Sequence, residues 1–203
     1  AAVAAVAALA LGVAALRFRR TLRRAEDRLL GQSAAIPTRF GLLEYADVGR
    51  GPPLLMLHGT GGGFDQGLSF AQGVLARGCR VIAPSRFGYL GSDFPADPTS
   101  ENQADALVHL LDALGIGRIA VAGGSAGALA AMQLALRHPD RCAALILLVP
   151  AGNLDGRDPA AMTRLGAWLV RRLLRSDALF WLALRLVPRL LIGTLLATDP
   201  ALL

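Results

Sequence analysis

The feature that most restricts the fold is a regular alternation of short apolar runs with amphipathic stretches. The apolar runs are "PPLLMLHG", "CRVIAPS", "RIAVAGG" and "CAALILLVPA", which are typical of strands covered on both faces. Between them, "FDQGLSFAQGVLARG" and "SENQADALVHLLDALGI" predict helices, with Asp65 and Ser100 as the expected N-caps. Strand, helix and strand in this order predict an α/β fold with a mostly parallel, doubly wound sheet.

Length and charge allow one domain with appendages. The chain has 203 residues, 54% of them hydrophobic, which is enough for one sizeable core. Its net charge of +6 is concentrated in residues 17–28, where six arginines face only Glu26 and Asp27. The rest is nearly neutral, whereas a nucleic-acid-binding domain would carry basic clusters on its own surface. We therefore expect no nucleic-acid partner.

The N-terminal segment "AAVAAVAALALGVAAL" is uncharged and is followed at once by "RFRRTLRR". It predicts a hydrophobic helix that anchors the chain in a membrane over residues 1–16, then a basic juxtamembrane helix and linker over 17–38. Arginines after the apolar run favour a retained anchor at the inner, cytoplasmic membrane, with the domain facing the cytoplasm. Two alternatives stay open: an export leader and a solvated amphipathic helix.

The stretch "VAGGSAGALAAMQLALRHPD" passes from a strand through Gly-x-Ser-x-Gly into a helix. A strand that turns this sharply into a helix lifts the serine hydroxyl above the edge of the sheet. Gly123 and Gly127 leave room for the close approach of strand and helix. The pattern predicts Ser125 as a catalytic nucleophile.

A glycine-rich loop, "LHGTGGG", follows an earlier strand. Acyl transfer needs backbone N–H donors aimed at the developing oxyanion. We expect Thr60 or Gly61 to supply one donor and Ala126 the other, with His58 and Gly59 ordering the loop. The loop lacks the Lys-Ser/Thr ending of a P-loop and the dinucleotide fingerprint, and no residue spacing suits a metal. We therefore predict no cofactor and no metal.

These pieces, together with "VIAPSRFGYLGSD" and the helical segment near the end of the chain, resemble the α/β-hydrolase family over about residues 40 to 200. The similarity is to its cap-bearing branch of esterases, epoxide hydrolases and carbon–carbon bond hydrolases. The resemblance implies a hydrolase core over 39–157 and a helical cap over 158–203. Both are incomplete by that comparison, because the family's last strands would follow them.

The resemblance also implies a catalytic triad in the chain order serine, acid, histidine. Ser125 takes the place of the nucleophile, and Ala126 that of the oxyanion donor after it. Gly124 stands where a histidine is more frequent. Asp155, after "LLVPAGNL", is the candidate acid, and an ordinary loop aspartate is the alternative interpretation.

The expected histidine is missing. The sequence contains only His58, His109 and His138, and none lies downstream of the serine and acid where the triad order requires it. Since a serine without a base is a poor nucleophile, these 203 residues alone are expected to hydrolyse esters little or not at all.

The sequence thus predicts a membrane-anchored serine hydrolase that cleaves an ester or related acyl bond of a small apolar molecule. The leucine- and tryptophan-rich cap favours an apolar substrate, although core packing explains its composition equally well. The alternatives are a catalytically inactive binding protein of the same fold and an acyltransferase. Dehalogenase and epoxide hydrolase chemistry is disfavoured, because those relatives carry an aspartate at the nucleophile position.

Overall fold

The computed structural model describes residues 2–150, 168, 172–173 and 175–189 of the chain. It divides into two compact units. One spans Leu29–Asn153, and the other combines Ala1–Arg28 with Leu154–Leu203. The first unit carries the sheet and the residues that the sequence singles out.

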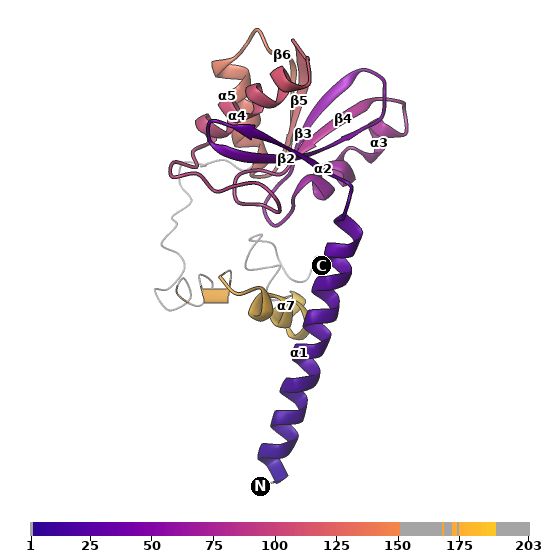
Figure 1. The fold of residues 1–203 in the computed structure, drawn as a ribbon, viewed down its shortest axis with the longest axis vertical. Helices are drawn as coiled ribbons and strands as arrows, with labels where there is room; N and C mark the ends of the chain where they lie inside the picture. Colours follow the sequence, from indigo (N-terminus) through magenta and orange to yellow (C-terminus); the bar gives the residue numbers. More distant parts are fainter. Residues whose placement is uncertain (1, 151–167, 169–171, 174, 190–203) are drawn as a thin grey trace. The chain divides into compact units, whose positions relative to one another are not determined.

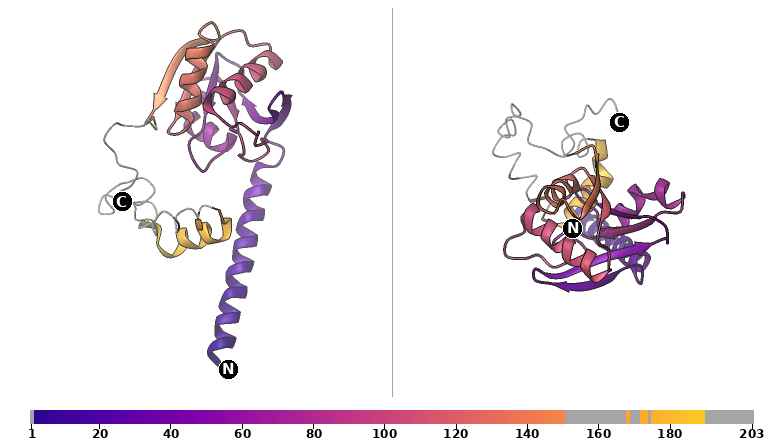
Figure 2. Two further views of the ribbon diagram at one scale, coloured as in Figure 1. Left: turned by 90° about the vertical axis from the view of Figure 1, so that its left-hand side faces the viewer. Right: turned by 90° about the horizontal axis from the view of Figure 1, so that it is seen from above.

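The first unit alternates strands and helices along the chain, as Figure 1 and the two further views in Figure 2 show. Its elements are β1 (Ala34–Thr38), β2 (Gly41–Val48), β3 (Pro53–Leu57), α2 (Phe64–Phe70), α3 (Gln72–Leu75), β4 (Arg80–Pro84), α4 (Ser100–Ala113), β5 (Ile119–Gly124), α5 (Gly127–Arg137) and β6 (Cys142–Leu148).

The strands form one sheet in the order β1-β2-β4-β3-β5-β6. β4, β3, β5 and β6 run parallel, while β1 and β2 form an antiparallel hairpin that also pairs antiparallel with β4. This is the mostly parallel α/β sheet that the sequence predicts. Because parallel strands end at the same edge, the segments that follow β3, β4 and β5 meet there.

Two apolar layers cover the sheet, and strand alternation explains them. Side chains along a strand point to opposite faces in turn. Leu55 and Leu57 of β3 therefore pack with α4 and α5 in one buried cluster, while Met56 between them joins Phe64 of α2 in another. Helices from both sides thus enclose β3, which explains why its sequence is a continuous apolar run.

Local boundaries differ from the expectation in four places. The helix expected over 64–78 is interrupted at Ala71. Thr99, one residue before the expected cap, is the N-cap of α4 and accepts a hydrogen bond from the Asn102 N–H. α2 has no side-chain cap, and Asp65 instead accepts from the Gly63 N–H at 3.2 Å. In addition, part of the segment expected as linker forms β1.

The second unit contributes α1 (Ala2–Leu29) and α7 (Asp177–Leu186). Ser176 caps α7 by accepting from the Leu179 N–H. Of the cap expected over 158–203, only the part around α7 falls within the described residues.

The membrane anchor predicted over residues 1–16 is contradicted. None of the helices in the described part of the chain is long and apolar enough to cross a bilayer. The apolar run reaches only about 24 Å at about 1.5 Å per residue, against a hydrocarbon core of about 30 Å. Much of it is alanine, and α1 continues from Arg17 into its arginine-rich half. The membrane location and membrane partner that rested on the anchor are corrected with it.

A buried carboxylate joins three elements of the first unit. Asp105 of α4 is 8% exposed, and it accepts hydrogen bonds from Arg39 at 2.7 Å, Arg137 at 3.0 Å and His138 at 2.8 Å. Burial acts to raise the pKa of Asp105, but the hydrogen bonds from His138 and Arg137 outweigh it and hold that pKa below its ordinary value. The network ties the turn between β1 and β2 to α4, and α4 to the end of α5.

Replacing Asp105 by asparagine should therefore destabilise the first unit by roughly 1 to 3 kcal/mol, because it removes the negative charge and one of the two oxygens that accept from Arg39, Arg137 and His138. The matched control is Asp112→Asn, since the Asp112 side chain is 62% exposed and, among the described residues, forms an ion pair only with Arg141. Urea unfolding at pH 7 measures both variants. Equal, small losses in the two would show that Asp105 contributes no more than a surface ion pair.

Candidate active site

Ser125 lies directly after β5 in a backbone conformation that is rare for a residue with a side chain. Its φ is +48°, and it is exposed at the carboxyl end of the strand. Its N–H donates to the Leu148 carbonyl at 2.9 Å, which ties the turn to the end of β6. Such strain persists only where surrounding structure enforces it, and it is common at catalytic sites.

The two glycines around Ser125 permit a close approach of backbones. A Cβ on Gly127 would lie 2.7 Å from the Leu57 carbonyl oxygen and closer still to that of His58. A Cβ on Gly123 would lie 2.7 Å from the Ala128 Cα. Only glycine fits at either position without displacing the end of β3 or the first turn of α5.

Gly124 has a different explanation. A Cβ there would lie 2.5 Å from the Phe70 ring, which comes from the end of α2. In this chain an aromatic ring therefore occupies the space next to the serine. No local pattern indicates that pairing, because Phe70 and Gly124 are far apart along the chain.

The glycine-rich loop lies against the serine. A Cβ on Gly59 would be 3.2 Å from the Cβ of Ser125. The Gly59 N–H donates to Gln66 Oε1 at 2.8 Å, whereas no hydrogen bond of the described residues uses the N–H groups of Thr60 or Ala126. Two unused donors thus flank the turn, and Ala126 precedes the N-terminus of α5, where the helix dipole favours negative charge.

The buried ring of His58 is neutral and orders the loop through two hydrogen bonds. Its Nδ1 donates to the Gly59 carbonyl at 2.7 Å, and its Nε2 accepts from the Arg86 N–H at 2.9 Å. A bare Nε2 and a protonated Nδ1 define one neutral tautomer. Burial is the main cause that lowers the pKa of His58 from 6.5 to about 4. With both nitrogens engaged, His58 cannot accept a proton from Ser125 in this arrangement.

Arg86, after β4, holds the same loop with its side chain. Its Nη2 donates to the Gly59 carbonyl at 3.0 Å, so that carbonyl accepts from both His58 and Arg86. The chain has no cis peptide bond among the described residues. In the trans peptide between Gly59 and Thr60, the Thr60 N–H therefore points away from the Gly59 carbonyl that accepts these hydrogen bonds.

The other histidines are not placed to act on Ser125. His109 lies within α4, with its ring 6.2 Å from that of Phe40. His138 follows the last turn of α5, which spans 11 residues and begins two residues after Ser125. At about 1.5 Å per residue, that places His138 roughly 16 Å away along the helix.

A cavity of about 400 Å³ adjoins the turn. Its lining residues come from the segment after β4 and from α4 and α5; they are Arg86, Phe87, Phe94, Pro98, Thr99, Ser100, Gln103, Ala126, Leu129 and Ala130. Ala126, whose N–H is one of the two unused donors, is therefore part of the cavity wall. This volume is within the usual range for small-molecule sites, about 300 to 1,000 Å³.

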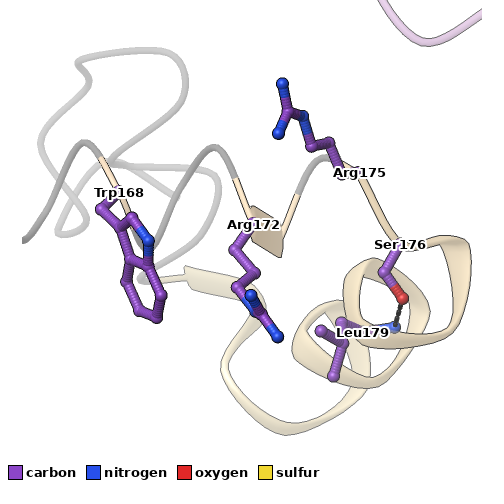
Figure 3. Close-up of a pocket in the computed structure, with 5 residues that line it drawn as sticks. All are labelled: Trp168, Arg172, Arg175, Ser176 and Leu179. Atoms are coloured by element: carbon purple, nitrogen blue, oxygen red, sulfur yellow. Dashed lines mark hydrogen bonds between the residues drawn. The ribbon is translucent and has the colours of Figure 1, made fainter.

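A second cavity, of about 370 Å³, lies in the other unit and is drawn in Figure 3. Trp168, Arg172, Arg175, Ser176 and Leu179 line it. Its serine hydroxyl already accepts from the Leu179 N–H. The wall offers cations and an aromatic ring but no nucleophile paired with a base.

Of the residues predicted for the site, the structure brings together Ser125, Ala126, His58, Gly59 and the loop at Thr60 and Gly61. Asp155 lies outside the described residues. Among those residues, no three His, Cys, Asp or Glu side chains cluster as ligands of a metal would.

Sequence reasoning missed Arg86, Gln66 and Gln103. Each of these side chains bonds to backbone from another part of the chain. The stretch "SRFGYLGSD" contributed to the resemblance but indicated no role for its arginine.

Comparison with known proteins agrees with the geometry. A family model described as the alpha/beta hydrolase fold matches residues 52–182. The 2-hydroxymuconate semialdehyde hydrolase of Pseudomonas sp. (strain CF600) is 39% identical over 110 residues, which are 52% of this chain and 39% of that protein. The chain therefore spans about two fifths of the length of this relative.

Solved structures show the same similarity. An alpha/beta hydrolase fold protein from Nakamurella multipartita has a TM-score of 0.57 and 34% identity, covering 70% of this chain and 52% of that one. An esterase from Exiguobacterium antarcticum has a TM-score of 0.53 and 26% identity, covering 58% of this chain and 45% of the esterase.

Gly127→Ala should destabilise the first unit by roughly 3 kcal/mol, because the new methyl group overlaps the end of β3. Gly117→Ala is the matched control, since a Cβ there meets nothing within 4 Å. Thermal and urea unfolding of both variants test this. A Gly127→Ala protein as stable as the control would show that the backbones need not approach so closely.

The neutral His58 should make stability depend on pH between about 4 and 6.5. Since the unfolded chain binds a proton there and the folded chain does not, the free energy of unfolding falls as pH is lowered through this range, by up to about 3 kcal/mol from His58. His58→Gln should lack this contribution. Urea unfolding at several pH values measures the difference, and parallel curves for the two proteins would contradict the assignment.

Proposed function

Because the chain belongs to the α/β-hydrolase fold family, we propose that it is the nucleophile-bearing part of a serine hydrolase acting on an ester or related acyl bond. The observation that carries the proposal is the exposed Ser125 at φ +48°. The packing of Gly59 against it, and the unused N–H groups of Thr60 and Ala126, support the proposal. Relatives named as a semialdehyde hydrolase and an esterase support hydrolysis of a small molecule.

In this proposal, Ser125 Oγ attacks the substrate carbonyl carbon and loses its proton to a base. The carbonyl π electrons move to oxygen, and the Thr60 and Ala126 N–H groups stabilise the resulting oxyanion. Collapse of the tetrahedral intermediate breaks the bond to the leaving group, which takes up the proton, and leaves an acyl-enzyme. Water then cleaves the acyl-enzyme to a carboxylic acid and free Ser125.

The loop geometry favours the oxyanion step. His58 and Arg86 both donate to the Gly59 carbonyl. This fixes the plane of the next peptide bond and polarises its N–H, that of Thr60, before substrate arrives. Preorganised donors cost no rearrangement during the reaction.

The described residues supply neither the base nor the acid of this mechanism, so both are part of the proposal. Asp155 is the proposed acid. None of the chain's three histidines is proposed as the base, for the reasons given by their partners and positions. The 203 residues alone should therefore hydrolyse p-nitrophenyl acetate no faster than their Ser125→Ala variant.

The lack of a base beside Ser125 among the described residues favours a second candidate, a binding protein of this fold without catalysis. If no histidine serves Ser125 anywhere in the natural protein, the cavity beside Ala126 would bind a ligand and leave it unchanged. The two candidates differ in the reactivity of the serine hydroxyl.

A fluorophosphonate probe distinguishes the two, because it labels only activated serines. On the natural protein that contains this chain, we expect labelling at Ser125, loss of labelling in Ser125→Ala, and wild-type labelling in Ser69→Ala, whose serine is exposed on α2. Mass spectrometry locates the adduct.

An unlabelled Ser125 in folded natural protein would refute the hydrolase and favour the binding protein. For the 203 residues alone, p-nitrophenyl acetate turnover that Ser125→Ala abolishes would refute the proposed need for a base outside them.

A further inference from the structure

The guanidinium of Arg86 is a partly buried charge without an acidic partner. No carboxylate of the described residues forms an ion pair with it. Its neighbours are the Gly59 carbonyl and Tyr89, whose ring centroid is 5.0 Å away and whose side chain also hydrogen-bonds with the guanidinium. Burial lowers the pKa of Arg86, and only Tyr89 opposes this. A buried cation of this kind is stabilised by a counter-ion.

Two buried donors in the same place also lack partners. Gln103 is 4% exposed, and its Oε1 accepts from the Phe87 N–H at 2.7 Å. That bond fixes the orientation of the amide, and the other branch, Nε2, is buried with no acceptor. Arg86 Nε is buried and unpaired as well. Buried donors without acceptors are rare and costly, so their occurrence in two residues that line one cavity points to an absent acceptor.

Both residues line the cavity of about 400 Å³ beside the serine turn. Ala126, the proposed oxyanion donor, lines it too, and Phe87, Phe94 and Leu129 make much of the remaining wall apolar. The cavity therefore combines a cation and amide donors with an apolar surface, next to the site of proposed attack.

We infer that this cavity binds a carboxylate on an apolar chain, with Arg86 and Gln103 as its recognition residues. Resting on the proposed function, this makes the substrate an acyl compound that bears a free carboxylate on the part that enters the cavity. The carboxylate supplies both the missing counter-ion and the missing acceptor. The cavity therefore binds such acids in preference to neutral esters of equal size.

Hexanoate and its neutral analogue hexanamide test the inference by titration calorimetry on the natural protein. We expect hexanoate to bind at least about tenfold more tightly, because only it carries the charge that pairs with Arg86. Equal affinities, or no binding of hexanoate, would overturn the inference without any variant.

Gln103→Glu then identifies the residues. The new carboxylate keeps an oxygen for the Phe87 N–H, replaces the unpaired donor and places a fixed negative charge beside Arg86. We expect the preference for hexanoate to disappear, with a melting temperature equal to or above that of wild type. Gln72→Glu, on exposed α3 and outside the cavity lining, changes the net charge equally and should keep the preference.

A preference for hexanoate that persists in folded Gln103→Glu would overturn the assignment to this cavity. The result is separate from the proposed function, because fluorophosphonate labelling of Ser125 is measured independently. Selective hexanoate binding with an unlabelled Ser125 would leave a carboxylate site in a binding protein. A labelled Ser125 without that selectivity would leave a hydrolase for other substrates.

Discussion

The site depends on the close contact of two backbones, the end of β3 and the turn that joins β5 to α5. The contact is limited by carbonyl oxygens of β3 and the following residue, against which Gly127 fits only because it has no side chain. The parallel pairing of β3 with β5 sets the two strand ends side by side. The strained φ of Ser125 and the position of Gly59 both follow from this contact, since the chain must reverse within a few residues of it.

A second layer of polar contacts makes the loop rigid. His58 is buried as a neutral ring, with one nitrogen bonded to its own loop and the other to the backbone after β4. Arg86 supplies both that backbone N–H and a side-chain bond to Gly59. The ends of β3 and β4 are thereby connected by a histidine that stays neutral near pH 7. In the proposed mechanism, groups other than these transfer the proton, so the residues that position the proposed oxyanion donors take no part in acid–base chemistry.

The local patterns predicted the sheet and its helices well, because strand alternation and helix amphipathicity are properties of neighbouring residues. They failed where the outcome depended on the length and composition of a whole helix. The apolar run before Arg17 looked like an anchor by its lack of charge, yet its length and alanine content do not make α1 a membrane-spanning helix. The helix expected over 64–78 broke at Ala71, between Gly67 and Gly73, two interior glycines that weaken a helix.

The sequence by itself determined the order of strands and helices, the glycines around Ser125 and the nearness of the serine to a strand end, because each follows from local sterics and spacing. Only the tertiary structure decided which donors stay unused, which tautomer His58 adopts and that Arg86 and Gln103 share a cavity wall. These depend on groups from separate strand ends meeting in space. No pattern along one segment encodes the partners that a side chain finds on another.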